Sequence, residues 1–591
     1  KLMCGIFGCT GENSLSNTLR ALKLLEYRGY DSVGVGVKTD KINVVKTVGR
    51  SQNLTYVCPK FEHIANCIGH TRWATHGAVE ARNAHPFVSY GGNFAIVHNG
   101  VIDNWQQLKN ELTDGGEVAF SSDTDSEVVA HLLERIYDGD MMSTLLNVAN
   151  ALQGSFAIVV QTTYDDNLYF VKRNSPLVVG VSANGEYICS DIRCLSTWAD
   201  KVCMPPDNTV GVVGKRIEVR SFDGNICPTE FFVPDKTGIA PPDDEVMLSE
   251  IFEIPDKIRF AKSNYIECGG IGLSARKLRS FNRIYLLGCG TAYHSGLSAA
   301  ANARKMLDID VLPVIASEFL YDNYPVDEHT LAFCISQSGE TADTILCAKK
   351  VAERGGYVYA VTNTDCSGLV FAANRSINVG AGGEFAVAST KAYNCQLVTL
   401  NLLLADIAVA TKRMLPSARD KLHKAVDDAA NAVSQILLRE EEIVRIAERI
   451  KSCQSVFFLG RTTDYPTAQE GALKMKEISY IHCEAYPAGE LKHGALALVE
   501  KGVTVIGLAT DISLVEKMRT SLSEVATRGA DVVCMSPYAL GYDGFRLPSV
   551  NQFVAPMVSV VPLQLLAYHV ARLLGRDIDK PRNLAKSVTV E

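Results

Sequence analysis

Long uninterrupted apolar runs are absent from this 591-residue sequence, and so are blocks of basic residues. A membrane-spanning helix needs roughly 18 consecutive apolar residues. The most apolar run, 397–410, is interrupted by Asn401 and Asp406, so we interpret it as a buried helix and expect no membrane association. The net charge is -8 without a basic stripe, which argues against a nucleic-acid partner.

Paired-cysteine motifs are also missing, although the chain contains 17 cysteines. Without a CxxC pair, neither a zinc ribbon nor a disulfide framework is indicated. The 12 histidines include no HExxH motif, and we expect no metal site. Many unpaired thiols, together with the lack of a signal-peptide h-region, favour a reducing, cytoplasmic location.

Hydrophobic patterning divides the chain into two dissimilar halves. Up to about residue 220, short alternating apolar runs are interspersed with two helical patterns near 19–25 and 125–136, which predicts a layered α+β domain. The stretch 223–245 is rich in Pro and Asp, as a linker is. Beyond it, apolar strands alternate with long helical periods, which is typical of a parallel sheet.

The second half repeats itself. RIYLLGCGT (283–291) resembles SVFFLGRTT (455–463), which places Gly288 and Gly460 172 positions apart. LAFCIS (331–336) matches VTVIGL (503–508) at the same offset, and AERGGYVYAV (352–361) matches ATRGADVVCM (526–535) at 174. Three matched pairs in the same order predict a duplicated, doubly wound α/β module.

Two loops of the first repeat follow predicted strands, where ligands bind in such sheets. ISQSGETADT (335–344) offers hydroxyls, a side-chain amide and backbone N–H groups at a helix start, which suits a phosphate. It lacks a lysine and the GxxxxGK[ST] spacing, so a sugar phosphate is favoured over a nucleotide. A plain N-capped turn is the alternative. The loop GCGTAYHSG (288–296) could equally be a tight turn.

Several charged residues of the second half have both a functional and a structural interpretation. Glu470, Lys474 and Glu477 share one face of a predicted helix, which suits either proton transfer or a solvated salt-bridge stripe. His493, in GELKHG, is by itself more often structural. Lys586, near the end of the chain, could be a solvated lysine of the tail.

The first half holds a second set of candidates. Cys4, in KLMCGIFG, is either a small core residue or a nucleophile. Arg72, in HTRWATHG, suits a substrate carboxylate. Asn99-Gly100 normally signals a hairpin turn but could form an oxyanion hole. SSDTDSE (121–127) places acids at a helix start, where N-capping is the structural alternative.

Together these stretches resemble the glutamine–fructose-6-phosphate aminotransferases, also called glucosamine-6-phosphate synthases. The resemblance covers essentially the whole chain. Each motif alone is weak, but ten in order are specific. They are CGIFG, LEYRGYDS, HTRWATHG, NAHP, HNG, SQSGETADT, VASTKAY, EGALKMKEISYIH, GELKHG and LAKSVTVE.

The resemblance implies an α+β amino-terminal-nucleophile (Ntn) glutaminase domain of four layers and tandem α/β sugar-isomerase (SIS) domains. The implied boundaries are 4–222 for the glutaminase, 223–245 for the linker, 246–420 and 421–578 for the SIS subdomains, and 579–591 for a catalytic tail. The implied reaction transfers the amide nitrogen of L-glutamine to D-fructose 6-phosphate with ketose-to-aldose isomerisation, giving D-glucosamine 6-phosphate and L-glutamate. This is the first step of amino-sugar biosynthesis. An internal ammonia channel, a homodimer or larger homo-oligomer, and no metal or organic cofactor are also implied.

In the glutaminase half, the resemblance implies that Cys4 attacks the glutamine amide and that its own α-amine is the base. An α-amine has a pKa of about 8, which suits this role better than the value of about 10.4 of a lysine. Asn99 and Gly100 would bind the oxyanion. The implied glutamine-binding residues are Arg72, Trp73, Thr75, His76 and Asp125, and Trp73 would also gate the channel.

In the SIS half, the resemblance implies that Lys586 forms a Schiff base with the ketose and that Glu477 moves the proton between C1 and C2. His493 would assist ring opening from the neighbouring subunit, and Glu470 and Lys474 would support the acid–base chemistry. The implied sugar-phosphate-binding residues are Thr291, Ser336, Gln337, Ser338, Thr341, Val387 and Ser389. The sequence departs from the family at Ala292, where Ser is common, and at Ile254, where Gln is common.

An α-amine base requires Cys4 to be the first residue of the active protein. We therefore expect translation to start at Met3 and Met3 to be removed, with Lys1 and Leu2 foreign to the active enzyme. Two rival functions remain. An amidophosphoribosyltransferase would need an acidic diphosphoribose-binding loop, which the second half lacks. A sugar-phosphate sensor would have no use for Lys586 or the charged helix face.

Overall fold

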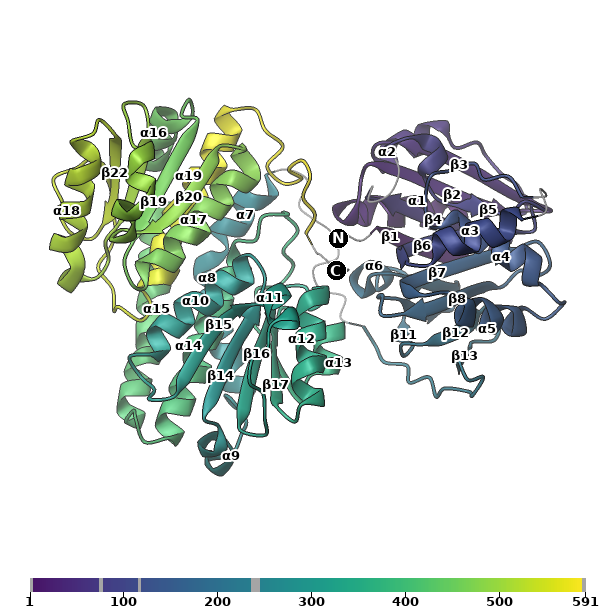
Figure 1. Ribbon diagram of the computed structural model, residues 1–591, viewed down its shortest axis with the longest axis horizontal. Helices are drawn as coiled ribbons and strands as arrows, with labels where there is room; N and C mark the ends of the chain where they lie inside the picture. Colours follow the sequence, from purple (N-terminus) through teal and green to yellow (C-terminus); the bar gives the residue numbers. More distant parts are fainter. Residues whose placement is uncertain (1–3, 74–77, 115–117, 235–244, 587–591) are drawn as a thin grey trace. The chain divides into compact units, whose positions relative to one another are not determined.

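The computed structural model describes residues 4–73, 78–114, 118–234 and 245–586, which form two compact units (Figure 1). The first unit contains the described residues up to 234, and the second contains those from 245 onward.

Two antiparallel sheets make up the centre of the first unit. One sheet has the order β11-β9-β10-β1-β4-β2-β3 and consists of β1 (Gly5–Thr10), β2 (Ser32–Lys38), β3 (Ile42–Val48), β4 (Asn66–Arg72), β9 (Val178–Ser182), β10 (Gly185–Cys189) and β11 (Lys201–Cys203). The other has the order β13-β12-β8-β7-β6-β5 and consists of β5 (Phe87–Val88), β6 (Phe94–Ile102), β7 (Gly154–Thr162), β8 (Leu168–Arg173), β12 (Thr209–Val213) and β13 (Glu218–Ser221).

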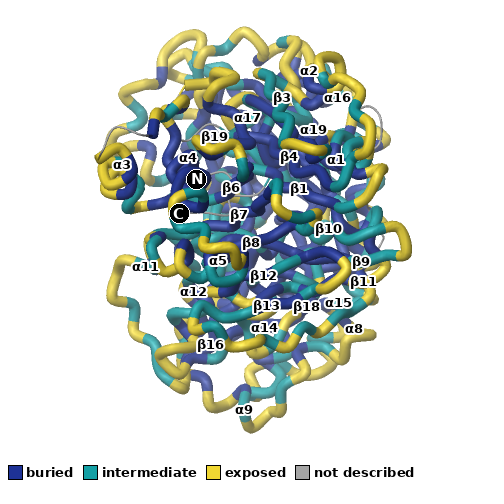
Figure 2. Tube along the Cα trace, turned by 90° about the vertical axis from the view of Figure 1, so that its right-hand side faces the viewer, coloured by how far each residue is buried: buried dark blue, intermediate teal, exposed yellow. Residues whose placement is uncertain are grey.

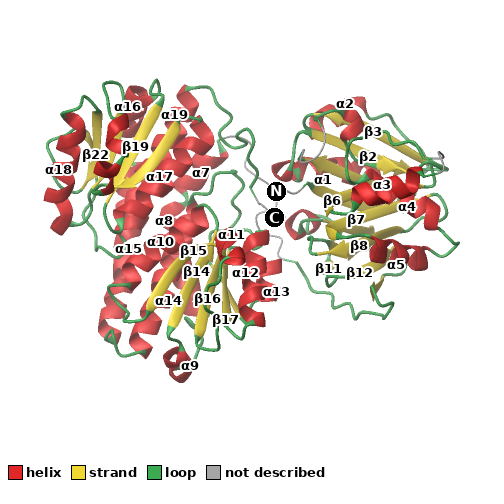
Figure 3. Ribbon diagram, in the orientation of Figure 1, coloured by secondary structure: helices red, strands yellow, loops and turns green. Residues whose placement is uncertain are grey.

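Helices cover the outer face of each sheet (Figure 3). One sheet is covered by α1 (Ser14–Leu24), α2 (Ser51–Val57) and α6 (Ile192–Leu195), and the other by α3 (Trp105–Thr113), α4 (Glu127–Ile136) and α5 (Met141–Ala151). Short 3-10 turns lie at η1 (Glu26–Arg28) and η2 (Ala81–Asn83). Apolar side chains of facing strands, such as Ile68 and Val97, pack between the two sheets. These layers confirm the predicted four-layer α+β half.

Two parallel sheets with the same strand order form the second unit. The first, β15-β14-β16-β17-β18, consists of β14 (Arg283–Gly288), β15 (Asp310–Ile315), β16 (Thr330–Ser336), β17 (Tyr357–Thr362) and β18 (Arg375–Asn378). The second, β20-β19-β21-β22-β23, consists of β19 (Ser455–Gly460), β20 (His482–Pro487), β21 (Thr504–Leu508), β22 (Asp531–Ser536) and β23 (Gly544–Arg546). The three sequence repeats correspond to the pairs β14/β19, β16/β21 and β17/β22, which confirms the duplication.

The helices of this unit cover both sheets, and Figure 1 shows α8, α10, α14, α17 and α19 between them. The helices are α7 (Val246–Phe252), α8 (Ile254–Glu267), α9 (Ala275–Ser280), α10 (Thr291–Ala303), α11 (Ala316–Tyr321), α12 (Ala342–Glu353), α13 (Gly368–Ala372), α14 (Lys391–Ala410), α15 (Pro416–Leu437), α16 (Glu440–Ile450), α17 (Asp464–Ser479), α18 (Val515–Ala526) and α19 (Ala555–Leu573). Three 3-10 turns complete it, η3 (Glu490–His493), η4 (Ala495–Leu498) and η5 (Ile512–Leu514).

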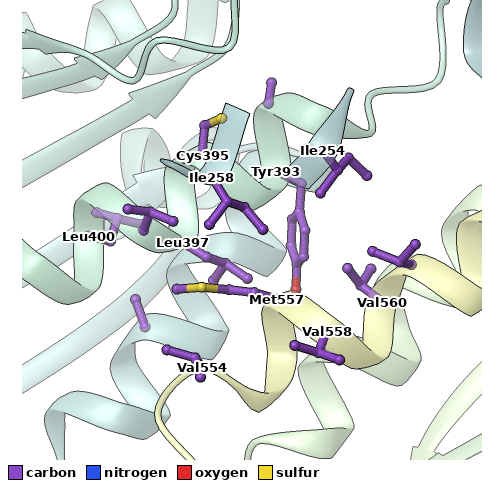
Figure 4. Packing of buried hydrophobic residues seen from close by; sticks show 14 of the residues in the cluster. Ile254, Ile258, Tyr393, Cys395, Leu397, Leu400, Val554, Met557, Val558 and Val560 are labelled. Carbon is purple, nitrogen blue, oxygen red and sulfur yellow. The ribbon is translucent and has the colours of Figure 1, made fainter. Parts of the chain in front are cut away.

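Helix α14 lies at the centre of the largest apolar core. By length and composition it is the only helix of the described chain that is apolar enough to cross a membrane, but 89% of its most apolar window is buried inside the protein. Figure 4 shows Tyr393 and Leu397 of α14 packed with Met557 and Val558 of α19. The predicted buried helix over 397–410 is therefore confirmed. Figure 2 shows most strands buried and the loops exposed.

Candidate functional site

Cys4 lies immediately before β1, which pairs with β4. Its Sγ accepts a hydrogen bond from the backbone N–H of Trp73 at 3.2 Å. Cys4 as a whole residue is only partly buried, unlike the fully buried core residue Cys9. Burial nevertheless raises the pKa of the Cys4 thiol to about 11, against the opposing effects of the Trp73 N–H and the Arg72 charge. The thiol is therefore protonated near neutral pH and needs a base before it can attack a carbonyl.

Asn99 and Gly100 are inside strand β6, where they pair with Ala157 and Phe156 of β7. The hairpin-turn interpretation of this dipeptide is therefore wrong. The Asn99 Nδ2 donates to the carbonyl oxygen of Cys4 at 2.8 Å. Gly100 has φ of +124°, and a Cβ built there would lie 2.0 Å from the Ser155 carbonyl oxygen. Only glycine fits at that position, and the strand brings the Asn99 amide to Cys4.

Two buried groups of opposite charge, Arg72 and Asp125, interact with each other, and the Arg72 charge also acts on Cys4. Arg72 ends β4, and burial lowers its pKa while the nearby Asp125 carboxylate favours the charged form. The Asp125 Oδ2 accepts the N–H of Ile102 at 2.9 Å. A guanidinium and a carboxylate that interact electrostatically could bind the two charged ends of an amino acid. Trp73 packs edge-on against Tyr30, with ring centroids 5.5 Å apart, and Thr75 and His76 lie outside the described residues.

The charged face of α17 is buried, so the solvated-stripe interpretation is wrong. The side chains of Glu470 and Lys474 are 0% and 1% exposed. The Lys474 Nζ lies 2.6 Å from Glu477 Oε2 and 3.5 Å from Glu470 Oε1. Although burial disfavours its charged form, the carboxylates of Glu477 and Glu470 raise the pKa of Lys474.

The start of α10, in the first of the two α/β modules, contacts this cluster of the second module. Thr291 Oγ1 donates to Glu470 Oε1 at 3.0 Å and accepts from Lys474 Nζ at 3.0 Å. The His294 Nδ1 lies 2.8 Å from Glu470 Oε2. The duplicated modules therefore meet at a buried set of acid, base and hydroxyl groups.

Lys586 is not a solvated lysine of the tail. Its Nζ is 2.6 Å from Glu384 Oε2, and the two side chains are 3% and 0% exposed. Glu384 also accepts the hydroxyl of Ser389 at 2.8 Å and backbone N–H groups at the start of α14. Although burial opposes it, the ammonium of Lys586 holds the pKa of Glu384 well below its usual range. The Glu384 carboxylate also raises the pKa of Lys474. The Lys586–Glu384 ion pair therefore lies near the α17 cluster.

The loop from β16 to α12 lies at the carboxyl edge of the first sheet, next to the loop that follows β14. Ser336 Oγ lies 2.8 Å from Thr341 Oγ1 and accepts the N–H of Gly339 at 3.0 Å. Ser338 Oγ accepts the N–H of Glu340 at 3.1 Å. Gln337 is partly exposed in the same turn. Val387 and Ser389, both partly buried, belong to the segment that leads from Glu384 into α14.

In the second module, a carboxylate occupies the position that corresponds to the start of α10. At the offset of the repeat, Asp464 stands where the first module has Ala292. The Asp464 carboxylate accepts the hydroxyl of Thr510 at 2.6 Å and its N–H at 2.9 Å. A buried carboxylate there would repel a phosphate, whereas Ala292 carries no charge.

His493 is not brought into the α17 cluster. It ends η3 and is exposed, and no contact among the described residues joins it to Lys474, Glu477 or Lys586.

Three residues that contact the candidate site residues were not predicted from the sequence, although two of them belong to motifs named above. His70 begins HTRWATHG and contacts Asn99, and His294 in GCGTAYHSG contacts Glu470. Glu384 directly precedes the segment that leads to VASTKAY, and a lone acid among apolar residues was its only signal.

Comparisons with known proteins agree with both units. A model described as a glutamine amidotransferase domain matches residues 70–197, and one described as a SIS domain matches 277–405 and 449–574. Curated proteins from Fusobacterium nucleatum and Clostridium acetobutylicum, both named glutamine–fructose-6-phosphate aminotransferase [isomerizing], are each 38% identical over 100% of both chains.

The solved structures add a match to the second unit. The C-terminal domain of glucosamine-fructose-6-phosphate aminotransferase from Francisella tularensis is 34% identical, with a TM-score of 0.55, and the match covers 58% of this chain and 100% of that one. A putative phosphosugar isomerase from Clostridium difficile, at 22% identity and a TM-score of 0.51, covers 57% of this chain and 96% of its own and shares the fold. Because full-length relatives are this similar, the chain belongs to the family of isomerizing glutamine–fructose-6-phosphate aminotransferases.

Proposed function

We propose that this protein transfers the amide nitrogen of L-glutamine to D-fructose 6-phosphate and isomerises the product to D-glucosamine 6-phosphate, releasing L-glutamate. One observation carries the proposal beyond the family assignment. The chain has two different reactive centres, a thiol beside the Asn99 amide and a buried lysine held by Glu384 near the acid–base face of α17.

In the glutaminase centre, the Cys4 sulfur attacks the side-chain carbonyl carbon of glutamine, and the α-amine of Cys4 takes the thiol proton. The Asn99 Nδ2 and the Gly100 N–H stabilise the oxyanion. Arg72 binds the α-carboxylate of the substrate and Asp125 its α-ammonium, with Thr75 and His76 as further binding residues. Collapse of the intermediate releases ammonia, and water then hydrolyses the thioester to glutamate.

In the SIS centre, Thr291, Ser336, Gln337, Ser338 and Thr341 bind the phosphate through hydroxyl, amide and backbone N–H groups. Val387 and Ser389 contact the sugar.

The amine of Lys586 condenses with the C2 carbonyl, with loss of water, and ammonia then displaces the lysine. Glu477 removes a proton from C1 and returns one to C2, while Lys474 and Glu470 hold it in place through the contacts described above.

Three features complete the proposal. Ammonia passes through an internal channel gated by Trp73, whose N–H contacts the Cys4 sulfur. His493 reaches the sugar of a neighbouring subunit, which requires at least a homodimer and fits its exposed position. All 17 cysteines are free thiols, which suits the cytoplasm.

Product analysis tests this function against its two rivals. Protein that begins at Cys4 is incubated with glutamine and either fructose 6-phosphate or phosphoribosyl diphosphate. We expect glucosamine 6-phosphate from the first acceptor and no diphosphate release from the second. Glutamate without an amino sugar, diphosphate release, or sugar-phosphate binding without turnover would each contradict the proposal.

A further inference from the structure

His70 of β4 is completely buried and contacts the residue assigned to the oxyanion hole. Its Nε2 lies 3.0 Å from the carbonyl oxygen of His98 and 3.2 Å from the Oδ1 of Asn99. Both neighbours are oxygens, so Nε2 must carry the proton. The other ring nitrogen, Nδ1, has no hydrogen-bond partner among the described residues, as suits a lone pair.

This donor determines which way the Asn99 amide points. With its Oδ1 accepting from His70, Asn99 directs Nδ2 to the opposite side, where it donates to the Cys4 carbonyl oxygen at 2.8 Å. If the Asn99 amide were flipped, its Nδ2 hydrogens would face the Nε2–H of His70, and its Oδ1 would face the carbonyl oxygen of Cys4. Neither contact would be a hydrogen bond. Asn99 is 1% exposed and His70 is 0% exposed, so bulk water does not relieve either conflict.

The histidine is also held in plane and kept neutral. Its ring stacks on His85, with centroids 4.0 Å apart and 23° between the planes. His85 is itself oriented, because its Nδ1 accepts the backbone N–H of His98 at 3.2 Å. Burial lowers the pKa of His70 to about 3. A neutral ring retains a single donor and adds no charge beside the oxyanion.

We propose that His70 is a positioning residue that fixes the orientation of the Asn99 amide, so that Nδ2 faces the oxyanion formed during attack by Cys4. The inference rests on the proposed glutaminase function. A flipped Asn99 would present Oδ1 to the developing negative charge and would replace a stabilising donor with a repulsive oxygen.

Two amide variants of His70, with one control at His85, test the inference in protein that begins at Cys4. In His70→Gln the longer side chain can place an N–H near the Nε2 position, so we expect kcat for glutamine hydrolysis to stay within about fivefold of the unmodified protein. In His70→Asn the amide ends near Nδ1 and cannot reach Asn99. Its kcat should fall on the order of a hundredfold, the typical loss of one oxyanion donor, with KM changed less than threefold.

The control His85→Phe replaces the imidazole that stacks on His70 and removes its hydrogen bond from the His98 N–H, but it removes no contact to Asn99, so its kcat should fall less than tenfold. Synthesis from free ammonia should be unchanged in all three variants, because that reaction uses the other unit. In an Asn99→Ala background, His70→Asn should cost less than a further threefold, since no amide is left to orient.

Equal activity of His70→Gln and His70→Asn would overturn the inference, as would a full His70→Asn loss in the Asn99→Ala background. If kcat fell as far in His85→Phe as in His70→Asn, the effect would be due to packing of the histidine rings and the inference would be overturned. Absence of glutamine hydrolysis in the unmodified protein would contradict the proposed function itself, and the inference with it.

Discussion

Lys586 and Lys474 are both almost fully buried, and each has a carboxylate oxygen within 2.6 Å of its ammonium group. A buried ammonium is costly unless it is paired. Each pair therefore holds its lysine at a defined place inside the second unit, and the loss of either partner would leave a buried charge uncompensated.

Replacing Lys586 with alanine should abolish synthesis of glucosamine 6-phosphate from either glutamine or ammonia. Glutamine hydrolysis should persist, because Cys4 belongs to the other unit. Parallel assays of glutamate and amino sugar measure the two activities, and Lys517→Ala, at an exposed position of α18, is the matched control. Equal loss of both activities would contradict the separation of the two centres.

The pH dependence of glutamine hydrolysis should report the base rather than the thiol. Because burial raises the pKa of Cys4 to about 11, the thiol does not ionise near neutrality. The α-amine accepts the proton only when it is itself deprotonated, so kcat/KM should rise with pH and level off above about 8.

A profile that rises only near pH 11 would contradict an α-amine base. Protein that retains Lys1, Leu2 and Met3 is the control, since its nitrogen at Cys4 is a non-basic amide. We expect that protein to hydrolyse glutamine poorly while it still aminates the sugar with free ammonia.

Among the secondary-structure elements, helix α4 stabilises the loop that precedes it, because Glu127 in its first turn binds the serines of that loop. Glu127 is buried and accepts hydrogen bonds from the backbone N–H and hydroxyl groups of Ser121 and Ser122. Ser126, at the N-cap position, makes no side-chain capping bond. The acid of SSDTDSE therefore holds the preceding loop in place, and that loop leads to Asp125.

Glu127→Gln should destabilise the glutaminase unit at neutral pH. Although burial opposes it, hydrogen bonds from His131, Ser121 and Ser122 lower the Glu127 pKa to about 2. Stabilisation by a lowered carboxyl pKa is complete above the unfolded value of about 4.5 and is lost as pH falls toward 2.

That difference corresponds to on the order of 3 kcal/mol at pH 7. Urea unfolding at pH 7 and pH 3 measures it, and the gap between Glu127→Gln and the unmodified protein should shrink at pH 3. A gap of the same size at both values would contradict the assignment.

The parallel sheets could be predicted because the strands of both modules are apolar along their length, and the repeat predicted that the two modules share one fold. The position of Asn99-Gly100 could not, because its local turn signal is overridden by pairing with β7. Neither could the burial of Lys586, since its partner Glu384 lies 202 positions away in sequence. The pairing of His70 with Asn99 likewise depends on two strands that belong to different sheets.

At the scale of the whole molecule, the exposed position of His493 leaves the SIS centre without that histidine in its own chain. A homodimer in which each subunit supplies His493 to the other would complete both sites.

Mixing two inactive variants tests this arrangement. His493→Ala and Lys586→Ala should each be inactive in amino-sugar synthesis. After unfolding and refolding together in equal amounts, half of the dimers would be mixed and would contain one intact site, which restores about a quarter of the normal activity. No recovery in verified mixed dimers would contradict donation of His493 from the partner.

In the proposed reaction, the nitrogen released at Cys4 ends on the sugar phosphate. Protein that begins at Cys4 is incubated with glutamine labelled with ¹⁵N at the amide, fructose 6-phosphate and an excess of unlabelled ammonium. We expect glucosamine 6-phosphate that carries ¹⁵N with little dilution. Label found only in the ammonium pool, with glutamate formed and the amino sugar unlabelled or absent, would contradict it.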